Sequence, residues 1–461
     1  MIPSLDSCHF SGIAGGGMSA LAQYLRFAGR KVSGSDRGFD RGGETTKRDY
    51  FAKHGIRITP QDGSGLESSH TALIVSTAIE SDNPEIRRAR ELNVPILHRS
   101  ELLAMICAEK KTVAVAGTSG KSTVSGMAYH VLEAGGLSPS LITGANLMSL
   151  QSRDLLGNAA AGTGDWLVIE ADESDGSLTR YRPEIGVLLN IEKDHQEIEA
   201  LMPLFQTFRD QCHRAVINAG DARCLEFRRD GDVLFDVHTV NGMKMERLEL
   251  REWNSRFTLG GVSFEIPVPG RYNVENALAA IALGVALNIP LAACAEGLSR
   301  FHGVERRFIR VGETRGITVV DDFAHNPAKV KAALETAKGK ALGKNRRVLA
   351  VFHPHGFAPM KLMGKDIMDA TAEVLDTGDR LYLPEIYYVG GTADQSISSE
   401  HLVEYLNANK PIGIFLHSKD EVLRAMVEEA RPGDFILSMG ARDPDLGGFS
   451  RKLLESLTAK G

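Results

Sequence analysis

The chain has 461 residues, of which 43% are hydrophobic and 24% are charged, and its formal net charge is −6. This balance is ordinary for a folded protein, and it excludes a global basic field for nucleic acid or anionic lipid, although a local basic cleft for phosphates stays open. At roughly 150 residues per domain, the length predicts about three domains.

The sequence also lacks the features of membrane, secreted and zinc-binding proteins. The chain has no stretch of about 18 apolar residues and no basic-then-apolar start, so we expect neither a membrane span nor a signal peptide. Its five cysteines are widely spaced and form no Cys-x-x-Cys motif, which argues against a disulfide framework or a zinc site. We therefore expect a reduced cytoplasmic enzyme with no nucleic-acid partner and no membrane insertion.

Short apolar runs alternate with helical patterns over the first hundred residues. The patterns predict strands at 9–13, 31–35 and 72–76 and helices at 19–28 and 84–92. Such alternation favours a parallel sheet with crossover helices. An apolar strand at 112–116 then opens a second unit, with strands at 168–170 and 185–190 and a surface loop near 157–164.

A weaker sheet near 232–268 and an Ala-rich helix at 273–287 come next. A third unit follows, with strands at 317–320, 347–352, 380–383 and 435–439. The predicted fold class is therefore α/β with three domains, at residues 1–108, 109–298 and 299–461.

The strongest motif is a glycine-rich phosphate loop directly after the strand at 112–116. Its backbone N–H groups and the start of the next helix suit phosphate oxygens. Lys121 would neutralise the β- and γ-phosphates, and Ser122 would bind Mg²⁺. Val115 stands where a generic loop has glycine, so an ordinary glycine-rich turn is the alternative. The loop consists of Gly117, Thr118, Ser119, Gly120, Lys121, Ser122 and Thr123.

Two acidic clusters follow neighbouring strands. One begins at Glu170 and the other ends at Asp194 and His195. Carboxylates and an imidazole at strand ends can hold a divalent metal that bridges ATP and a second substrate. Either cluster alone is more often a solvated loop, but beside a phosphate loop the pair predicts a metal site.

A glycine turn between the first strand and its helix would let a diphosphate approach a helix N-terminus. Gly15, Gly16 and Gly17 form this turn, which can bind a nicotinamide cofactor, a UDP-sugar or nothing. Asp36 ends the second strand, where a dinucleotide fold contacts ribose. An oxidoreductase is therefore an alternative hypothesis.

The third unit carries weaker candidates. Arg306 and Arg307 precede a strand, residues 321–327 follow it, and His353 and His355 flank Pro354. Surface charge explains the arginines equally well, and a turn before a helix that starts with proline explains 321–327. A lone His-x-His is weak evidence for a metal site.

Taken together, these motifs resemble the Mur ligase family and, within it, the branch specific for UDP-N-acetylmuramate. The resemblance runs in order from about residue 8 to 450, and the family's own phosphate loop lacks the generic glycine. It implies ATP and Mg²⁺ as cofactors, with Lys121, Glu170 and His195 catalytic and with Ser122, Glu170 and His195 at the metal. Beyond the loop, the residues implied to contact ATP are Asn273, Asn276, Arg307, Asp322 and His325. The residues implied to bind the UDP-sugar are Gly15, Gly16, Gly17, Met18, Asp36, Ser76, Thr77, Ala78, Ile79, Asn83 and Arg99.

The same resemblance implies a Rossmann-like UDP-binding domain, a central P-loop ATPase domain and a C-terminal Rossmann-like domain that selects the amine. The implied reaction joins the carboxylate of UDP-N-acetylmuramic acid to L-alanine, or to another L-amino acid, through an acyl phosphate in peptidoglycan biosynthesis. His355 and Lys361 are the residues predicted to bind the amine, and the oligomeric state is left open.

Departures from the family pattern lie mostly in the C-terminal half. Asn326 stands where the L-alanine-adding member has a second histidine, and Gly356 and Pro359 replace its usual arginines. Two alternatives therefore remain: a ligase that attaches the L-Ala-γ-D-Glu-meso-diaminopimelate tripeptide in cell-wall recycling, and a catalytically inactive nucleotide-binding module.

Overall fold

The computed structural model describes residues 5–193, 197–339, 342–344, 346–388, 396–441, 443 and 446–460. The chain divides into two compact units. The first comprises Met1–Leu248, Arg256–Pro267 and Asn273–Val304, and the second comprises Glu249–Ser255, Val268–Tyr272 and Glu305–Gly461. Among the described residues, no helix is long and apolar enough to cross a membrane.

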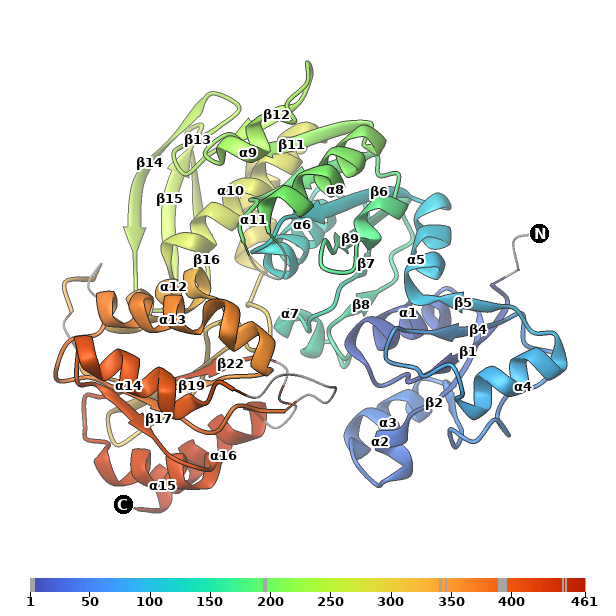
Figure 1. The fold of residues 1–461 in the computed structure, drawn as a ribbon. Coiled ribbons are helices and arrows are strands. Elements are labelled where there is room, and N and C mark those ends of the chain that lie inside the picture. Colours follow the sequence, from blue (N-terminus) through green and yellow to red (C-terminus); the bar gives the residue numbers. More distant parts are fainter. Residues whose placement is uncertain are drawn as a thin grey trace. The chain divides into compact units, whose positions relative to one another are not determined.

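The first sheet is parallel and has the strand order β3-β2-β1-β4-β5 (Figure 1). Its strands are β1 (Ser7–Ser11), β2 (Lys31–Ser35), β3 (Arg57–Ile58), β4 (Ala72–Val75) and β5 (Ile96–His98). Its helices are α1 (Gly16–Phe27), α2 (Arg37–Asp40), α3 (Thr45–Lys53), α4 (Pro84–Leu92) and α5 (Arg99–Ala108). The predicted bounds of β2 and α4 are confirmed residue for residue. The start of α4 is well marked in the sequence, because Asn83 caps the helix and Pro84 is its first residue.

The second sheet has the order β16-β15-β14-β13-β12-β11-β10-β6-β9-β7-β8. Its phosphate-loop half contains β6 (Lys111–Ala116), β7 (Ser140–Ile142), β8 (Ala159–Ala160), β9 (Trp166–Ala171), β10 (Ile185–Leu188) and β11 (Arg214–Asn218). The other half contains β12 (Val233–Phe235), β13 (Thr239–Val240), β14 (Met243–Leu250), β15 (Ser255–Leu259) and β16 (Val262–Ile266). The helical segments are α6 (Lys121–Ala134), α7 (Met148–Gln151), η1 (Ser177–Arg180), α8 (Ile198–Gln211), α9 (Ala222–Leu225), α10 (Arg271–Ala286) and α11 (Leu291–Ser299).

The third sheet belongs to the second unit and has the order β17-β18-β22-β19-β20-β21, with only the β17–β18 pair antiparallel. Its strands are β17 (Ile309–Thr314), β18 (Ile317–Asp322), β19 (Val348–His353), β20 (Arg380–Leu383), β21 (Gly413–Phe415) and β22 (Phe435–Gly440). Its helices are α12 (Pro327–Lys338), α13 (Phe357–Val374), α14 (Ser399–Asn409), α15 (Lys419–Glu429) and α16 (Leu446–Ala459).

Both faces of the third sheet are buried. Alternate strand residues enter different apolar clusters, so Val320 packs with α12, α13 and α14 while Val319 packs with α15 and α16. Figure 1 shows these two groups of helices on opposite sides of the strands. Burial on both faces explains why β18, β19 and β22 carry consecutive apolar residues and do not alternate apolar with exposed polar ones.

The surface loop predicted near 157–164 is wrong for residues 157–160, which are buried and include β8. Asn158 lies there, only 2% exposed, and its side chain donates to Gly16 O at 3.0 Å and accepts from Gln23 Nε2 at 2.7 Å. Glycines and alanines at 157–164 suggested exposure, but the segment instead joins the second sheet to the glycine turn of the first.

Candidate active site

The phosphate loop lies at the carboxyl end of β6, between β10 and β9. Parallel pairing places Ala116 opposite Leu188 on one side and Ala171 on the other, so the loops after all three strands meet at one edge. Gly117 has φ +143° and Gly120, which precedes α6, has φ +87°. Both values lie in the region that glycine tolerates best, which explains two of the loop's glycines.

Gly120 also has a spatial role. A Cβ at this position would lie 2.7 Å from Asn276 Oδ1, so the side chain of α10 closes directly over the loop. Asn276 Nδ2 in turn donates to Asn273 Oδ1 at 3.4 Å. The structure therefore brings these two predicted ATP contacts to the phosphate loop.

Lys121 is held by the acidic cluster that follows β9. Its Nζ lies 2.5 Å from Glu173 Oε2 and 3.9 Å from Asp172 Oδ1, and it donates to Gly117 O at 2.8 Å. Burial raises the pKa of Glu173, and the charge of Lys121 offsets this only in part. Burial also acts to raise the pKa of Asp172, but Lys121 and hydrogen bonds from Ser174 outweigh it and lower that pKa.

Glu170 is the second-to-last residue of β9, and its Oε1 accepts hydrogen bonds from Gly144 N at 3.1 Å and from Thr143 Oγ1. Ser122, 8% exposed, begins α6 beside Lys121. Carboxylate and hydroxyl oxygens suit Mg²⁺, so these two residues fit the predicted metal ligands. His195 lies outside the described residues. The described part of the chain holds no group of three or more His, Cys, Asp or Glu that could bind a metal.

Asn190 braces the loop from the end of β10, a role that the sequence did not reveal. Its Oδ1 accepts from Thr118 Oγ1 at 2.9 Å and from Ser119 N at 2.8 Å, and its Nδ2 donates to Ser119 O at 3.1 Å. Its backbone oxygen accepts from Thr118 N at 3.1 Å. Its place at the carboxyl end of a strand was the one available signal for this contact.

The glycine turn of the first sheet is organised by Asp36. This carboxylate accepts from Ala14 N at 3.0 Å and from Gly38 N at 2.8 Å, so it fixes the turn and caps α2. Gly15 caps α1, and Gly16, Gly17 and Met18 form its first residues. A Cβ on Gly16 would lie 3.0 Å from Gly144 O, so this glycine is also needed for contact with the second sheet.

Arg99 connects the turn to the acidic cluster. Its Nη2 lies 2.5 Å from Asp175 Oδ2, and a Cβ on Gly17 would lie 3.3 Å from its Nη1. A guanidinium at a helix N-terminus suits a diphosphate. Nearby, Ile79 packs on Gly12 in the loop of Ser76, Thr77 and Ala78 after β4.

Asn83 is 2% exposed, and its Oδ1 accepts from Glu85 N at 2.9 Å. Its Nδ2 is buried with no hydrogen-bond partner among the described residues. The structure thus gives Asn83 a capping role, and its UDP-sugar contact stays a prediction.

In the second unit, Asp321 and Asp322 are the last residues of β18 and not part of the following loop. Burial raises the pKa of Asp321 to about 6, against the opposing charge of Arg306 at 3.2 Å. Burial also raises the pKa of Asp322, whose Oδ1 accepts from Ala324 N at 2.6 Å. The guanidinium of Arg307 lies 4.8 Å from the Phe323 ring centre.

Asn326 accepts from Lys329 N at 2.9 Å and caps α12, with Pro327 in the first turn. The turn-before-a-helix explanation therefore holds for these two residues. His325 lies 5.8 Å from His355, measured between ring centres. His355 is buried at the end of β19, whereas Lys361 is exposed on α13.

The fold and the phosphate loop at the carboxyl edge of the second sheet define a P-loop protein. A lysine, a serine and a carboxylate lie at this loop, where nucleotide phosphates bind in such proteins. Three family models match in order: "Mur ligase family, catalytic domain" over residues 7–111, "Mur ligase middle domain" over 115–284 and "Mur ligase, glutamate ligase domain" over 306–442. The chain therefore belongs to the Mur ligase family and has its three-domain architecture.

Individual ligases match the chain over almost its whole length. The UDP-N-acetylmuramate–L-alanine ligases of Streptomyces avermitilis and Burkholderia pseudomallei (strain 668) are each 35% identical, covering 95% and 98% of both chains respectively. The crystal structure of UDP-N-acetylmuramate–alanine ligase from Thermotoga maritima has a TM-score of 0.80 and 28% identity, covering 99% of this chain and 100% of that one. A murein peptide ligase from Psychrobacter arcticus, with a TM-score of 0.66 and 21% identity, shares the fold.

Proposed function

We propose that the chain is an ATP-dependent, ADP-forming ligase that joins the carboxylate of UDP-N-acetylmuramic acid to L-alanine in peptidoglycan biosynthesis. The observation that carries this proposal is the phosphate loop, with Lys121 poised between Gly117 O and Glu173 and with Glu170 on the neighbouring strand. The near full-length relatives named for this reaction support L-alanine over the tripeptide.

In the first step, the sugar carboxylate would attack the γ-phosphorus and the bond to the β,γ-bridging oxygen would break, giving an acyl phosphate and ADP. In the second, the amine would attack the acyl carbon and phosphate would leave. The sugar carboxylate and the γ-phosphate are both anionic, so cationic groups must offset their repulsion. Lys121 supplies such a charge once the phosphates replace Glu173 as its partner.

We further propose that Ser122 and Glu170, with His195, hold Mg²⁺. When bound, the ion would neutralise charge developing on the transferred phosphoryl group. Thr143 and Gly144 orient Glu170 by donating to its Oε1. Asn190 keeps the loop in shape for the nucleotide, and Asn276 covers it. The predicted domain boundaries near 108 and 298, the remaining substrate contacts and the cytoplasmic location stay predictions.

The test is amine-dependent release of ADP and phosphate with UDP-N-acetylmuramate, run with L-alanine, glycine, L-serine and the tripeptide. We expect the highest kcat/KM with L-alanine. A higher value with the tripeptide would favour the recycling ligase. No ADP release with any amine would favour an inactive nucleotide-binding module.

A further inference from the structure

A cavity of about 470 Å³ opens at the amino ends of β1 and β2. Its lining includes Ser7, Lys31 and Arg57, the first residues of β1, β2 and β3. The predicted UDP-sugar residues follow the opposite, carboxyl ends of β1 and β4. Five residues at roughly 3.3 Å each separate the two ends of β1 by about 16 Å. The cavity is therefore distinct from the candidate active site.

The lining of this cavity is strongly cationic. Arg26, Arg30, Lys31 and Arg57 contribute positive charge, and Glu67 is the one carboxylate in the lining. Glu67 is engaged by Arg57 at 2.7 Å, and Arg30 pairs outside the lining with Asp6.

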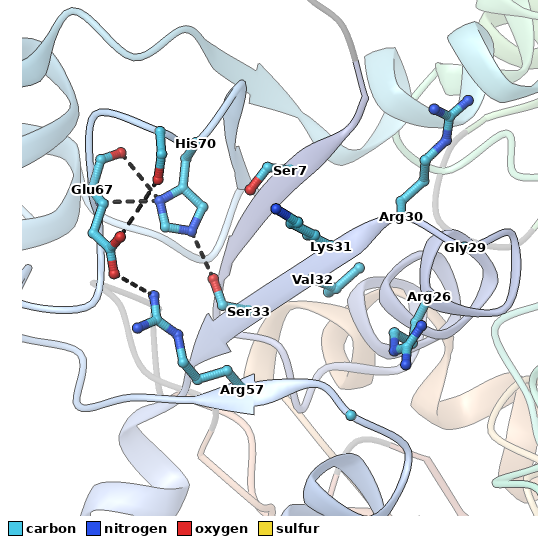
Figure 2. Close-up of a pocket in the computed structure, with 12 residues that line it drawn as sticks. Ser7, Arg26, Gly29, Arg30, Lys31, Val32, Ser33, Arg57, Glu67 and His70 are labelled. Atoms are coloured by element: carbon cyan, nitrogen blue, oxygen red, sulfur yellow. Dashed lines mark hydrogen bonds and ion pairs between the residues drawn. The ribbon is translucent and has the colours of Figure 1, made fainter.

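Two of these cations have no carboxylate partner in the part of the chain that the structure describes. There, Arg26 donates to the backbone oxygen of His54 at 3.1 Å. Lys31 has no ion pair or side-chain hydrogen bond with any described residue. Figure 2 shows Lys31 in the middle of the lining, with Arg57, Glu67 and His70 on one side of it and Arg26 and Arg30 on the other. A volume of this size is typical of small-molecule sites, and the charge selects an anion.

A buried chain of hydrogen bonds fixes one wall of the cavity. His70 Nε2 lies 2.9 Å from Ser33 Oγ, which lies 2.8 Å from His9 Nδ1, and His9 Nε2 lies 2.9 Å from Glu85 Oε1. Both ring nitrogens of His9 thus have buried partners, and Ser33 Oγ links the two imidazoles. His70 Nδ1 then accepts from Glu67 N at 3.0 Å. The orientation of the His70 ring is thus set before any ligand arrives.

We propose that this cavity is a second anion-binding site of the protein, for a small molecule that carries a phosphate or diphosphate group. Lys31 and Arg57 would contact the anion from the amino ends of β2 and β3, and Arg26 would lie at the far wall. The cavity combines four cationic side chains, of which Lys31 is exposed and accessible to a ligand, with a wall that buried hydrogen bonds hold in place. The inference does not depend on the ligase activity proposed above.

The test is isothermal titration of the full chain at constant ionic strength with inorganic pyrophosphate and, separately, glucose 1-phosphate. The background is Lys121→Ala, which weakens pyrophosphate binding at the phosphate loop. We expect binding to persist in Lys121→Ala and to weaken about tenfold in Lys121→Ala/Lys31→Ala, because one direct charge contact is lost. Lys121→Ala/Lys452→Ala, which alters an exposed lysine of α16, should bind like its parent.

The two probes separate the sources of the phosphate group. Stronger binding of pyrophosphate would identify a free inorganic anion, and stronger binding of glucose 1-phosphate would identify a phosphate ester that fills more of the cavity. Equal affinity in the Lys31→Ala and Lys452→Ala backgrounds, or no binding to Lys121→Ala, would overturn the proposal. Lys31→Ala alone should keep ligase turnover within about twofold, since electrostatic effects across this distance are largely screened.

Discussion

The phosphate-loop edge of the second sheet and the carboxyl edge of the third sheet are built in different ways. At the first edge, Lys121, Glu170 and Asn190 each have polar partners among the described residues. At the second, both ring nitrogens of His353 are buried with no hydrogen-bond partner among the described residues, as is Asp321 Oδ1. At the first edge the side chains predicted to act are held by hydrogen bonds before substrates bind, and Ser119 Oγ is the buried atom there without a partner in the described chain. At the second edge a whole imidazole and a carboxylate oxygen lack hydrogen bonds within the described chain.

The difference follows the sequence pattern. The phosphate-loop edge keeps the family's loop and its carboxylate, while the third-sheet edge is where Asn326, Gly356 and Pro359 depart from it. The matched structures include one named for alanine and one named for a murein peptide, so the amine is where ligases of this fold differ. The prediction that the third-sheet edge selects the amine agrees with the departures being there.

The largest expected effect is the loss of turnover when Lys121 is removed from the phosphate loop. Lys121→Ala takes away the main protein charge opposite the β- and γ-phosphates, and we expect kcat to fall by about 10²–10³-fold or more. The control is Lys111→Ala, which alters an exposed lysine at the start of β6, the strand before the loop. ADP release within tenfold of wild type would show that the phosphate loop is misassigned.

The buried imidazole at the second edge should make stability depend on pH. Burial lowers the pKa of His353 to about 3 from an ordinary 6.5. The unfolded chain therefore binds a proton between these values while the folded chain does not, so the free energy of unfolding should fall as pH drops from about 6.5 towards 3. Each unit of pKa difference corresponds to about 1.4 kcal/mol.

His353→Gln tests this contribution, since glutamine does not titrate and keeps a polar side chain of similar size. Denaturant unfolding at pH 7 and pH 4.5 should show a smaller difference in the variant than in wild type. His417→Gln, which alters an exposed histidine of the same unit, is the control. Identical pH dependence in wild type and His353→Gln would mean that His353 is protonated in the folded state.

The variant Asn190→Ala tests whether ATP binding depends on the hydrogen bonds that hold the phosphate loop in shape. Asn190→Ala removes three side-chain hydrogen bonds to Thr118 and Ser119, each worth about 0.5–1.5 kcal/mol. We expect the KM for ATP to rise about tenfold, equivalent to about 1.4 kcal/mol, with the KM for the UDP-sugar nearly unchanged. Asn218→Ala loses bonds to Leu189 and Gly220 but none to the loop, so it should lower stability without this selectivity.

Much of the fold was predictable because local signals agreed with burial. The strand Lys31–Ser35 and the helix Pro84–Leu92 were predicted at their exact bounds, since turn residues and a proline mark their ends. The phosphate loop was also evident, because glycines, lysine and serine are contiguous there. The pairing of Lys121 with Glu173 was not predictable, because it depends on β9 lying beside β6. The contacts of Asn190 and Asn158 likewise arise only when distant segments meet.

The variant Glu173→Gln tests whether the ion pair between Glu173 and Lys121 weakens ATP binding. Glu173→Gln removes a buried negative charge that competes with the phosphates for this lysine, so we expect the KM for ATP to fall about threefold. Asp172→Asn, 3.9 Å from the ammonium, should have a smaller effect. A KM that rises instead would show that Glu173 positions Lys121 for the nucleotide and does not compete with it.

The smallest effect is expected at Lys361, on the edge proposed to select the amine. The carboxylate of an incoming amino acid needs a cation, and the family's arginines are absent at Gly356 and Pro359. Lys361 is exposed on α13, five residues beyond Gly356, which precedes that helix. A lysine offers a point charge and not a bidentate fork, so its hold on a carboxylate is looser and its removal costs less. We expect Lys361→Met to raise the KM for L-alanine about threefold, with the KM values for ATP and UDP-sugar nearly unchanged. Lys365→Met, on the next turn of the same helix, is the matched control. Equal KM values for L-alanine in both variants would make Lys361 a surface charge and leave the burial of His355 as the remaining feature of the proposed amine site.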